Sequence, residues 1–536
     1  MTSQPNFLLI TTDQQRADHL GCYGNSIVKT PAIDGLAQRG ILFEQFYVAC
    51  PICMPNRVAI LTGRMPTINR TRHNGIALSR DAVTFVDVLR AGGYHTGLVG
   101  KSHAQNITGR PLKPRDNHEY SQTKSEPPNE LADAHRTRRV GPEYEAELMP
   151  LWHANPTRNE PELPYYGYDY VRFANGHSDH VQGHYTHWLN EQCGDGDALR
   201  GPENALASEG FSAPQAWRTA VPESLYPTNY IAEQSCLFID EHVRTQKASP
   251  FFLHCSFTDP HHPFTPPGKY FDMYSPYDMP LPESFAHRDP NEPPLLTQLR
   301  QEYENGEALT NGPAPFCVDE KQTREIIALT FGMITCVDDA IARLLAHLET
   351  LGIADNTVVI FTSDHGDFMG DHGIMLKHGL HYNGVIQVPF IYADPQRQGS
   401  TRSQVPGSSI DTGAIILARA GLKPFNGFQG IDLIGVQDNA TNNPRRGILI
   451  EEDELGEHVN QEHGVRVRSY IENNWRISLW DGVEKGELFD LNADPHELNN
   501  LWSQFEFADK KAQLTEAMLR ETIRLNDTAP LATHIA

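Results

Sequence analysis

Short apolar runs along the chain are followed at once by polar side chains. The run Phe7–Ile10 in "NFLLITTDQQ" predicts one buried strand, and the run Thr96–Val99 in "GYHTGLVGKSH" predicts another. Two more strands are predicted over Phe251–Phe257 and Val358–Thr362. Because the run Phe7–Ile10 is continuous rather than alternating, it is typical of a strand covered on both faces of a parallel sheet.

Helical patterns fill the intervals between these strands. Apolar positions recur about every 3.6 residues over Phe85–Ala91 and Glu325–Leu351. The alternation predicts an α/β fold in which helices flank a mostly parallel central sheet. In such folds the ligand site lies beyond the carboxyl ends of the strands, so we expect the residues that follow the four runs to meet at one edge. These residues are Asp13, Gln14, Lys101, His103, His261, His262, Asp364 and His365.

The remaining patterns divide the chain into a large and a small unit. Residues 105–215 are rich in Pro, Gly, His and charge, and we expect them to form long loops and short elements over the site, which make up the substrate pocket. Further on, "GVRVRSYIENNWRISLW" and "GELFDLNADPHELNNLW" predict antiparallel strands with a turn at Asn473–Asn474, followed by a helix over Ala508–Leu525. We therefore predict a catalytic α/β domain over 1–440 and a smaller C-terminal α+β domain over 441–536.

Length and composition narrow the class of protein. The chain has 536 residues, enough for more than one domain of roughly 100–200 residues. No apolar run approaches the roughly 18 residues of a membrane span, and the N-terminus lacks the basic and apolar segments of a secretory signal. The eight cysteines are too scattered for a disulfide framework. We therefore expect a cytoplasmic protein.

The excess of acidic residues narrows the kinds of molecule that the protein is expected to bind. Lys and Arg number 44 against 68 Asp and Glu, which gives a formal net charge of −24. This balance disfavours nucleic acid and anionic membranes, because both bind basic surfaces. An anionic substrate would therefore have to be bound by local positive charge in a cleft.

Residues 50–57, "CPICMPNR", contain two overlapping cysteine patterns. Cys50 and Cys53 form a C-x-x-C pair, which suggests a redox couple or half of a zinc site. A redox pair requires a compact thioredoxin-like unit with a low-pKa thiol, and structural zinc requires a second close pair of ligands. The chain has no second C-x-x-C, which disfavours both interpretations.

The second pattern is C-x-P-x-R, made by Cys53, Pro55 and Arg57. Pro55 suits the first turn of a helix that continues through "RVAILTGR". Cys53 is therefore predicted at a helix N-terminus, where backbone N–H groups and the helix dipole favour an anion. Arg57 lies one turn further on and can reach back toward it.

C-x-P-x-R followed by "LTGR" resembles the modification signature of type I sulfatases in the alkaline phosphatase superfamily, and the resemblance extends over most of the chain. It implies an alkaline phosphatase-like fold in which Cys53 is oxidised to formylglycine, whose hydrate is the nucleophile and is held by Arg57. The implied ligands of one divalent metal ion are Asp13, Gln14, Cys53, Asp364 and His365. The implied remaining catalytic residues are Lys101 and His103 in "GKSH", His261 in "PHHP" and Lys377 in "GDHGIMLKHG".

The family chemistry gives these residues roles. The oxygen-rich ligand set favours Ca²⁺, while His365 leaves Mn²⁺ or Mg²⁺ open. Lys101 and Lys377 would bind the oxygens of the transferred group, and His261, alone or together with Lys101, would protonate the leaving group. The second hydroxyl would lose its proton to His103, which resolves a covalent ester intermediate. Asn74 in "RHNG" is assigned to the substrate pocket, with a role in a turn as the alternative.

Two positions depart from the commonest sulfatase pattern. Gln14 stands where many sulfatases have a second aspartate, and His365 where many have asparagine; both resemble the phosphonate monoester and phosphodiester hydrolase branch. Lys101 and His103 resemble the sulfatase branch. We therefore expect an arylsulfatase-type hydrolase of small anionic sulfate monoesters. Phosphonate monoester or phosphodiester cleavage is the alternative, or a side activity of the same site.

The resemblance also implies a formylglycine-generating enzyme as a partner during maturation, and the amphipathic C-terminal helix favours a homo-oligomer. Two other classes of protein were weighed. A catalytically silent anion-binding protein with this fold would lack one of the groups named above, and none is missing. A zinc or redox module would be distinguished by a metal assay and a thiol titration.

Overall fold

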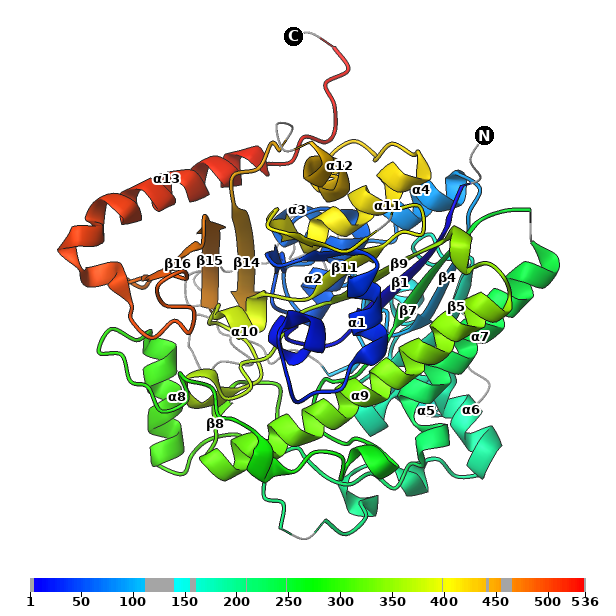
Figure 1. Cartoon of the computed structure of the whole chain (residues 1–536), viewed down its shortest axis with the longest axis horizontal. Helices are drawn as coiled ribbons and strands as arrows, with labels where there is room; N and C mark the ends of the chain where they lie inside the picture. Colours follow the sequence, from blue (N-terminus) through cyan, green and yellow to red (C-terminus); the bar gives the residue numbers. More distant parts are fainter. Residues whose placement is uncertain are drawn as a thin grey trace, which may run out of the picture.

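The computed structural model describes residues 4–110, 139–154, 161–208, 210–246, 248–397, 399–439, 443–454 and 465–534. A large sheet with helices on both faces forms the body of the molecule, and a smaller antiparallel sheet lies beside it (Figure 1). The long helix α13 (Ala508–Arg524) runs over the smaller sheet (Figure 1). The α/β prediction is therefore confirmed, as is the small antiparallel unit.

The four strands expected from the sequence are neighbours at the centre of a nine-stranded sheet. They are β1 (Asn6–Thr12), β4 (His95–Gly100), β7 (Phe251–Ser256) and β9 (Thr357–Ser363). Their order is β9-β1-β7-β4, and every pairing among them is parallel. Their carboxyl ends therefore lie side by side at one edge of the sheet.

Five further strands complete this sheet. On the β9 side lie β11 (Phe390–Ala393), β2 (Ile41–Phe43) and β12 (Thr401–Ser403), and on the β4 side lie β5 (Tyr170–Asn175) and β6 (Gln182–Gly183). Strand β11 is antiparallel to both β9 and β2, and β6 is antiparallel to β5. The sheet is thus mostly parallel, as expected, with antiparallel pairs toward its edges.

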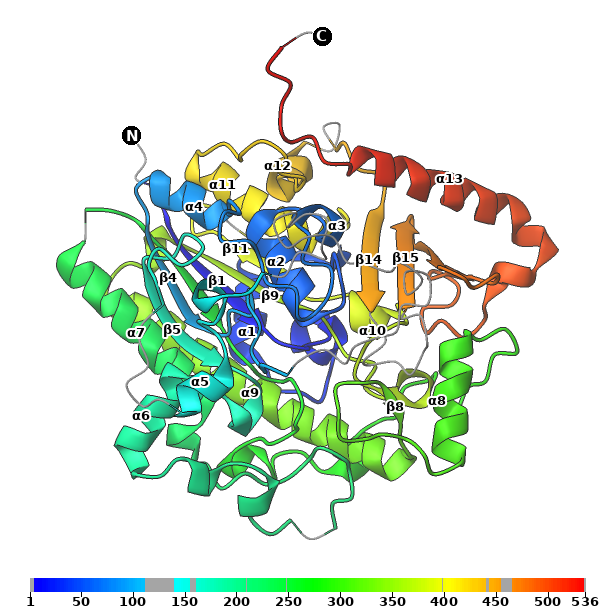
Figure 2. The ribbon, with the colours of Figure 1, turned by 180° about the vertical axis from the view of Figure 1, so that it is seen from behind.

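Alternate side chains of β1 pack into different layers. Phe7 and Leu9 belong to the apolar core shared with α2 (Cys53–Thr62), α4 (Phe85–Ala91) and α11 (Thr412–Ala420). Leu8 and Ile10 belong to the core shared with α7 (Pro227–Thr245) and α9 (Glu320–Thr350). Figures 1 and 2 show these helices from the two sides of the molecule. Burial on both faces explains why the strand sequence is continuously apolar.

Helix α9 begins five residues before the predicted start at Glu325. Asp319 accepts a hydrogen bond from the backbone N–H of Gln322, and the Gln322 side chain accepts one from the backbone N–H of Asp319. This capping box satisfies two N–H groups that the helix itself leaves unpaired. Apolar periodicity alone does not include these polar positions, so the prediction began too late.

The remaining described elements are short. The helices are α1 (Pro31–Gln38), α3 (Pro66–Asn69), α5 (Met149–Ala154), α6 (His184–Cys193), α8 (Pro294–Glu304), α10 (Asn383–Ile386) and α12 (Leu433–Asp438). The strands are β3 (Phe46–Tyr47), β8 (Phe316–Cys317), β10 (Ile374–Met375) and β13 (Gly407–Ser408). None of the helices in the described part of the chain is long and apolar enough to cross a membrane.

The smaller sheet consists of β14 (Ile448–Glu454), β15 (Val465–Glu472), β16 (Trp475–Trp480) and β17 (Glu487–Asp490) in sequential antiparallel order. The predicted turn at Asn473–Asn474 joins β15 to β16, and both residues have positive φ, of 51° and 59°. Asparagine tolerates this conformation, which two-residue hairpins require. The predicted domain boundary at 440 and 441 lies outside the described residues, so the division remains a prediction.

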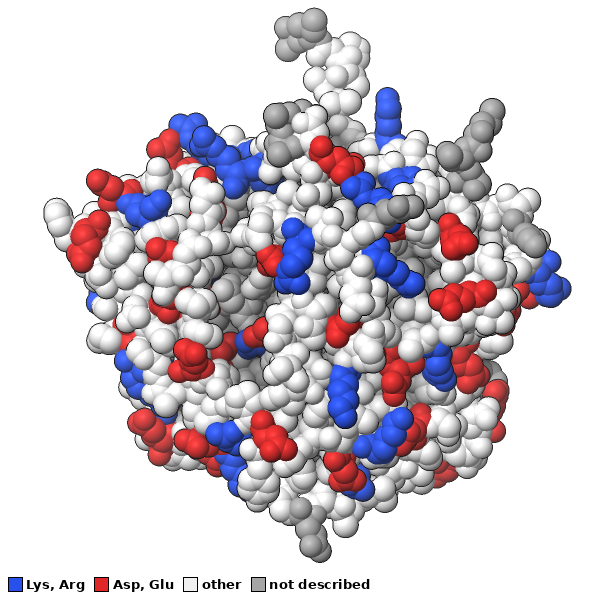
Figure 3. All heavy atoms as spheres, viewed as in Figure 1, with Lys and Arg blue, Asp and Glu red and all other residues white. Residues whose placement is uncertain are grey.

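The molecular surface carries both signs of charge. Acidic and basic side chains are interspersed over the face in Figure 3. Helix α13 turns Leu514 and Met518 into the protein, whereas Leu519 and Ile523 are each 60% exposed. The expected homo-oligomer and cytoplasmic location remain predictions.

Candidate active site

The ends of the central strands bring the expected polar residues together. The backbone N–H of Asp13 donates to the carbonyl of Asp259 at 3.2 Å, and that of Gln14 donates to Oδ1 of Asp364 at 3.1 Å. Asp13 and Asp364 are completely buried. Residues from β1 and β9, some 350 positions apart, therefore share one site.

Cys53 lies at the first position of α2, as the sequence predicts. The amide oxygen of Asn56 accepts from the backbone N–H groups of Ala49 and Cys50, at 3.0 and 3.3 Å, and holds the chain that enters the helix. The backbone N–H of Met54 donates to Oδ1 of Asn74 at 3.2 Å. Asn74 thus caps the backbone beside Cys53, and its assignment to the substrate pocket remains a prediction.

Four side chains form a compact set of potential metal ligands: Asp13, Cys53, Asp364 and His365. Each offers one ligand atom, and these atoms lie within 4.8 Å of one another. His365 Nδ1 is 2.9 Å from the carbonyl oxygen of Gly366, so the ring proton lies on Nδ1. The lone pair of Nε2 is then the one that can bind a metal. Nε2 lies 3.0 Å from Sγ of Cys53.

The protonation states of His365 and Asp13 are those that favour binding of a divalent cation. Burial lowers the pKa of His365 to about 4, so its imidazole is neutral at pH 7. Burial alone would raise the pKa of Asp13, but Lys101 and Arg57 outweigh it and hold that pKa well below its usual range. Ionised carboxylates and a neutral imidazole are the forms that bind divalent metals. The residues therefore fit the metal that the sequence implies.

Gln14 has a left-handed backbone, with φ of 62°. Its Oε1 accepts a hydrogen bond from Nζ of Lys377 at 2.6 Å, and its Nε2 lies near His262 and Asp367. A metal bound through Oε1 would compete with Lys377 for this oxygen. The assignment of Gln14 as a metal ligand remains a prediction.

Arg57 forms hydrogen bonds both to the two acidic ligands and to residues at the carboxyl ends of β4 and β7. Its Nε donates to Asp364 at 2.7 Å and one terminal nitrogen donates to Asp13 at 3.3 Å. The other terminal nitrogen donates to Oγ of Ser256 at 2.8 Å and to the carbonyl of Lys101 at 3.1 Å. Arg57 therefore orients both carboxylates. That it also holds the formylglycine hydrate formed from Cys53 remains a prediction.

Two lysines supply positive charge at the rim of this set. Nζ of Lys101 contacts Oδ2 of Asp13 and lies 2.8 Å from Nε2 of His177. Nζ of Lys377 lies 2.9 Å from Nε2 of His261. Both lysines are almost completely buried in a protein with a large net negative charge. The local positive charge that an anionic substrate requires is therefore present.

His261 is placed between Lys377 and Cys53. Its Nδ1 is 2.6 Å from the carbonyl oxygen of His262 and carries the proton, while Nε2 lies 4.0 Å from Sγ of Cys53. Burial, and next His177, hold the pKa of His261 well below its usual value. Nε2 of His261 therefore accepts a hydrogen bond from the Lys377 ammonium.

His103 follows Lys101 in a left-handed conformation, with φ of 57°. Burial, and then Lys101, keep its pKa well below the usual value. Its backbone N–H donates to Glu147 at 2.7 Å, and Glu147 also accepts from the N–H groups of Ala104 and Gln105, each at 3.1 Å. The loop that carries His103 is therefore fixed by one buried carboxylate.

The sequence prediction missed His177 and Glu147. The ring of His177 stacks on that of His261 at 3.5 Å between centroids. His177 follows β5, a strand that was not predicted; with β5 recognised, it would have joined the polar residues that follow strands. Glu147 lies in the segment interpreted as loops, and no local signal distinguishes it.

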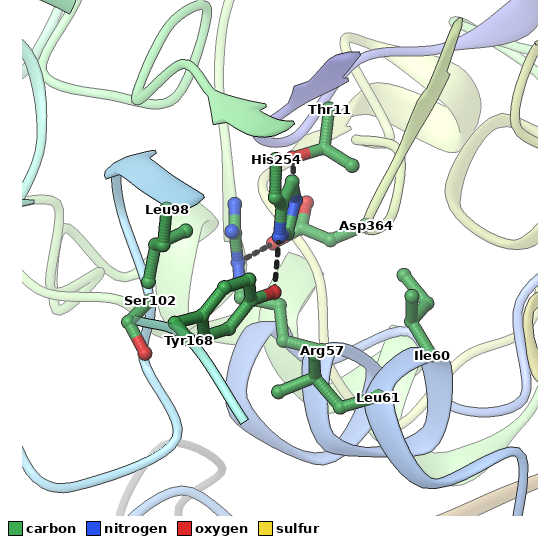
Figure 4. Close-up of a pocket in the computed structure, with 9 residues that line it drawn as sticks. All are labelled: Thr11, Arg57, Ile60, Leu61, Leu98, Ser102, Tyr168, His254 and Asp364. Carbon is green, nitrogen blue, oxygen red and sulfur yellow. Dashed lines mark hydrogen bonds and ion pairs between the residues drawn. The ribbon is translucent and has the colours of Figure 1, made fainter. Parts of the chain in front are cut away.

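Arg57 is one of the residues that line a small cavity (Figure 4). Its volume of about 10 Å³ is close to the room that one water molecule needs. Its lining residues are Thr11, Arg57, Ile60, Leu61, Leu98, Ser102, Tyr168, His254 and Asp364. His254 bridges two of them, with Nε2 2.9 Å from the Thr11 hydroxyl and Nδ1 3.0 Å from the Tyr168 hydroxyl. These bonds satisfy both nitrogens of a neutral imidazole.

His254 is expected to make stability depend on pH. Burial, and then Arg57, lower its pKa from 6.5 to about 3. Between these values the unfolded chain binds a proton that the folded protein does not, so the free energy of unfolding falls as the pH drops through this range. His254→Gln should reduce the slope by up to about 1.4 kcal/mol per pH unit. Denaturant unfolding from about pH 4 to 6 measures it, with equal slopes above about pH 7.5 as the internal control. An unchanged slope at low pH would contradict the assignment.

Comparisons with known proteins agree with this arrangement. The family model described as "Sulfatase" matches residues 5–422, and the one described as "N-sulphoglucosamine sulphohydrolase, C-terminal" matches residues 370–524. An arylsulfatase from Clostridium perfringens is 27% identical over 97% of this chain and 94% of its own. A multifunctional alkaline phosphatase superfamily protein from Trinickia caryophylli is 24% identical over 93% and 91%.

A solved structure shares the fold over nearly the full length. It is a phosphonate monoester hydrolase from Agrobacterium radiobacter, with a TM-score of 0.74 and 23% identity, covering 99% of this chain and 98% of its own. Because the family model spans most of the chain, the protein belongs to the sulfatase family. The sequence-based assignment to the type I sulfatases of the alkaline phosphatase superfamily is thus confirmed.

Proposed function

We propose that the protein is a formylglycine-dependent hydrolase of sulfate monoesters, of arylsulfatase type. Membership of the sulfatase family supports sulfate ester hydrolysis in general. The position of Cys53 is the observation on which the proposal depends. Cys53 lies at a helix N-terminus, close to the potential metal ligands on one side and to His261 on the other. A nucleophile at this position faces both the metal and the groups that bind an anion.

Cys53 itself is poorly suited to attack. Burial raises the pKa of its thiol above the ordinary value, although Lys377 and Lys101 oppose the shift. The thiol therefore stays protonated at neutral pH, and only the thiolate is nucleophilic. Oxidation by a formylglycine-generating enzyme would remove this obstacle, because the hydrated aldehyde supplies a hydroxyl in place of the thiol.

Asp13, Asp364 and His365 would hold the divalent cation, with Ca²⁺ as the first choice among hard cations. When bound, such a cation would neutralise an ester oxygen and acidify a neighbouring hydroxyl. Lys101 and Lys377 would bind the other oxygens of the sulfate as preorganised charges. Each ammonium group has three N–H donors, so it could bind a sulfate oxygen while keeping the partners named above.

His261 is the residue nearest to a departing alkoxide. Because Nε2 of His261 lacks a proton at rest, it cannot serve directly as an acid. Lys377, 2.9 Å away, can supply the proton through it. His103 is the candidate base for the second hydroxyl, since its low pKa keeps it neutral.

The alternative function is hydrolysis of phosphonate monoesters or phosphodiesters. Gln14 and His365 favour it, because they replace the aspartate and asparagine that are common in sulfatases. A phosphonate monoester hydrolase is also among the proteins that share the fold. A monoanionic phosphonate ester resembles a sulfate monoester in charge, so the same site is suited to both.

Rates on three aryl substrates test the proposal. The aryl sulfate is expected to have a kcat/KM at least about tenfold above those of the phosphonate monoester and the phosphodiester, which is about 1.4 kcal/mol of transition-state preference. The same metal-loaded, formylglycine-containing preparation should be used for all three. The reverse order would favour the alternative, and no hydrolysis of any of them would contradict both.

A further inference from the structure

Lys377 lies in a turn with unusual backbone conformations. Leu376 and His378, on either side of it, have φ of 71° and 103°, and Gly379 has φ of 74°. Left-handed conformations disfavour side chains with a Cβ, so they persist only where the surroundings impose them. Something outside this turn must therefore hold it.

The surroundings include a buried carboxylate from the smaller sheet. Glu452, on β14, is only 1% exposed. Its Oε1 accepts a hydrogen bond from the backbone N–H of Gly379 at 2.9 Å and lies 3.6 Å from Nδ1 of His378. Its Oε2 lies 3.1 Å from Nε2 of His381. One carboxylate thus contacts three residues of the five that follow Leu376.

Other parts of the C-terminal region hold the same segment. Nε1 of Trp480, on β16, donates to the carbonyl oxygen of Gly379 at 2.8 Å. Both polar groups of the Gly379 backbone are therefore bound by the smaller sheet. Downstream, Glu497 accepts from the backbone N–H of Asn383 at 2.7 Å.

The groups around Glu452 keep its carboxylate ionised. Burial by itself would raise the pKa of Glu452, but the neighbouring imidazoles of His378 and His381 lower it to about 2. Nδ1 of His381 lies 2.8 Å from the hydroxyl of Ser469 on β15, which fixes the orientation of its ring. A charged acceptor makes stronger hydrogen bonds than a neutral one, and more so in a buried place.

We propose that Glu452 is a positioning residue for Lys377. By fixing the turn, it aims the Lys377 ammonium at Gln14 and His261, where the transferred group would bind. The smaller sheet then contributes to the active site, because its side chains fix the turn that carries Lys377. The inference rests on the proposed role of Lys377, and the experiments below separate the failure of one from the failure of the other.

Kinetics of paired variants provide the first test. Glu452→Gln should lower kcat/KM for the aryl sulfate by roughly 10- to 100-fold, as loss of a supporting partner does at other sites. Glu472→Gln is the matched control, because Glu472 also accepts a hydrogen bond in this sheet, from Tyr470 at 3.1 Å, but at the turn end of β15. It should leave kcat/KM unchanged. A loss of less than about twofold in Glu452→Gln would overturn the proposal.

A double-mutant cycle separates positioning from general destabilisation. If Glu452 acts through Lys377, Glu452→Gln should cause no further loss in a Lys377→Ala background. If the two losses multiply, Glu452 acts independently of Lys377 and the proposal is wrong. Trp480→Phe, which removes the bond to the Gly379 carbonyl, is a second variant in case Glu452→Gln does not fold.

Amide hydrogen exchange tests the turn without any substrate. Exchange in the peptide that contains Gly379 should be faster in Glu452→Gln than in the wild type, and unchanged in Glu472→Gln. Unchanged exchange in Glu452→Gln would overturn the proposal whatever the activity. Faster exchange in a protein whose wild type hydrolyses none of the esters would support the positioning and reject the proposed function.

Discussion

Cys53→Ala is expected to lower kcat/KM for an aryl sulfate by at least about a thousandfold, as removal of a nucleophile does in other hydrolases. Cys53 lies within reach of both the potential metal ligands Asp364 and His365 and the imidazole of His261. No neighbouring side chain at the start of α2 offers a replacement, since Met54 and Pro55 follow it. The kinetics should be accompanied by circular dichroism to show that the variant is folded.

Mass spectrometry of the peptide that contains Cys53 completes this prediction. Replacing the thiol-bearing carbon by an aldehyde lowers the mass by about 18 Da, and activity should scale with the converted fraction. Cys50→Ala is the matched control: Cys50 is equally buried, three residues away, and should be dispensable. Full activity in protein with only the thiol would contradict the mechanism, and equal losses in both variants would revive the C-x-x-C interpretation.

Asp364→Asn is also expected to lower the activity strongly, because it weakens the binding of the metal. The substitution removes one of the two anionic ligands and half of the carboxylate pair that Arg57 holds. An amide is a weaker ligand for a hard cation than a carboxylate, so both metal content and kcat/KM should fall, the latter by about a hundredfold or more. Elemental analysis and kinetics on the same preparation measure the two effects.

Chelation and a second variant control this experiment. Treatment of the wild type with a chelator should abolish activity, and added Ca²⁺ should restore it; recovery with Mn²⁺ alone would correct the choice of ion. Asp394→Asn is the matched variant. Asp394 is also buried and paired with an arginine, Arg419, but it follows β11, which runs antiparallel and ends at the opposite edge of the sheet. Equal losses in both variants would exclude a specific role for Asp364.

The central sheet was predictable because its strands are buried on both faces. Such strands are rich in apolar residues, and the four runs named in the sequence became the four central strands. Strand β5 was missed because Tyr170 and Arg172 interrupt its apolar character; the Arg172 guanidinium lies over the Tyr170 ring, 4.7 Å from its centroid. Edge positions admit such polar pairs, so periodicity fails where the sheet meets solvent.

The site was predictable to the extent that its residues follow those strands or share a short motif. Asp13, Lys101 and Asp364 are of this kind, and the structure brings them together. Glu147 and Glu452 are not, because each acts on a loop tens of residues away in the sequence through hydrogen bonds to its backbone. Backbone N–H groups are present at every residue except proline, so their partners leave no trace in the pattern of side chains.

If Cys53 is converted to formylglycine as proposed, its burial determines when the conversion can take place. Cys53 is 3% exposed in the folded protein, so an oxidising enzyme would have to act on it before folding buries it. Asp364 and His365, which complete the enclosure, are synthesised about 310 residues after Cys53. At typical ribosomal speeds of about 5–20 residues per second, this delay is roughly 15–60 s. A host that translates this message faster, or makes the oxidising enzyme too sparsely, would accumulate correctly folded but permanently inert protein.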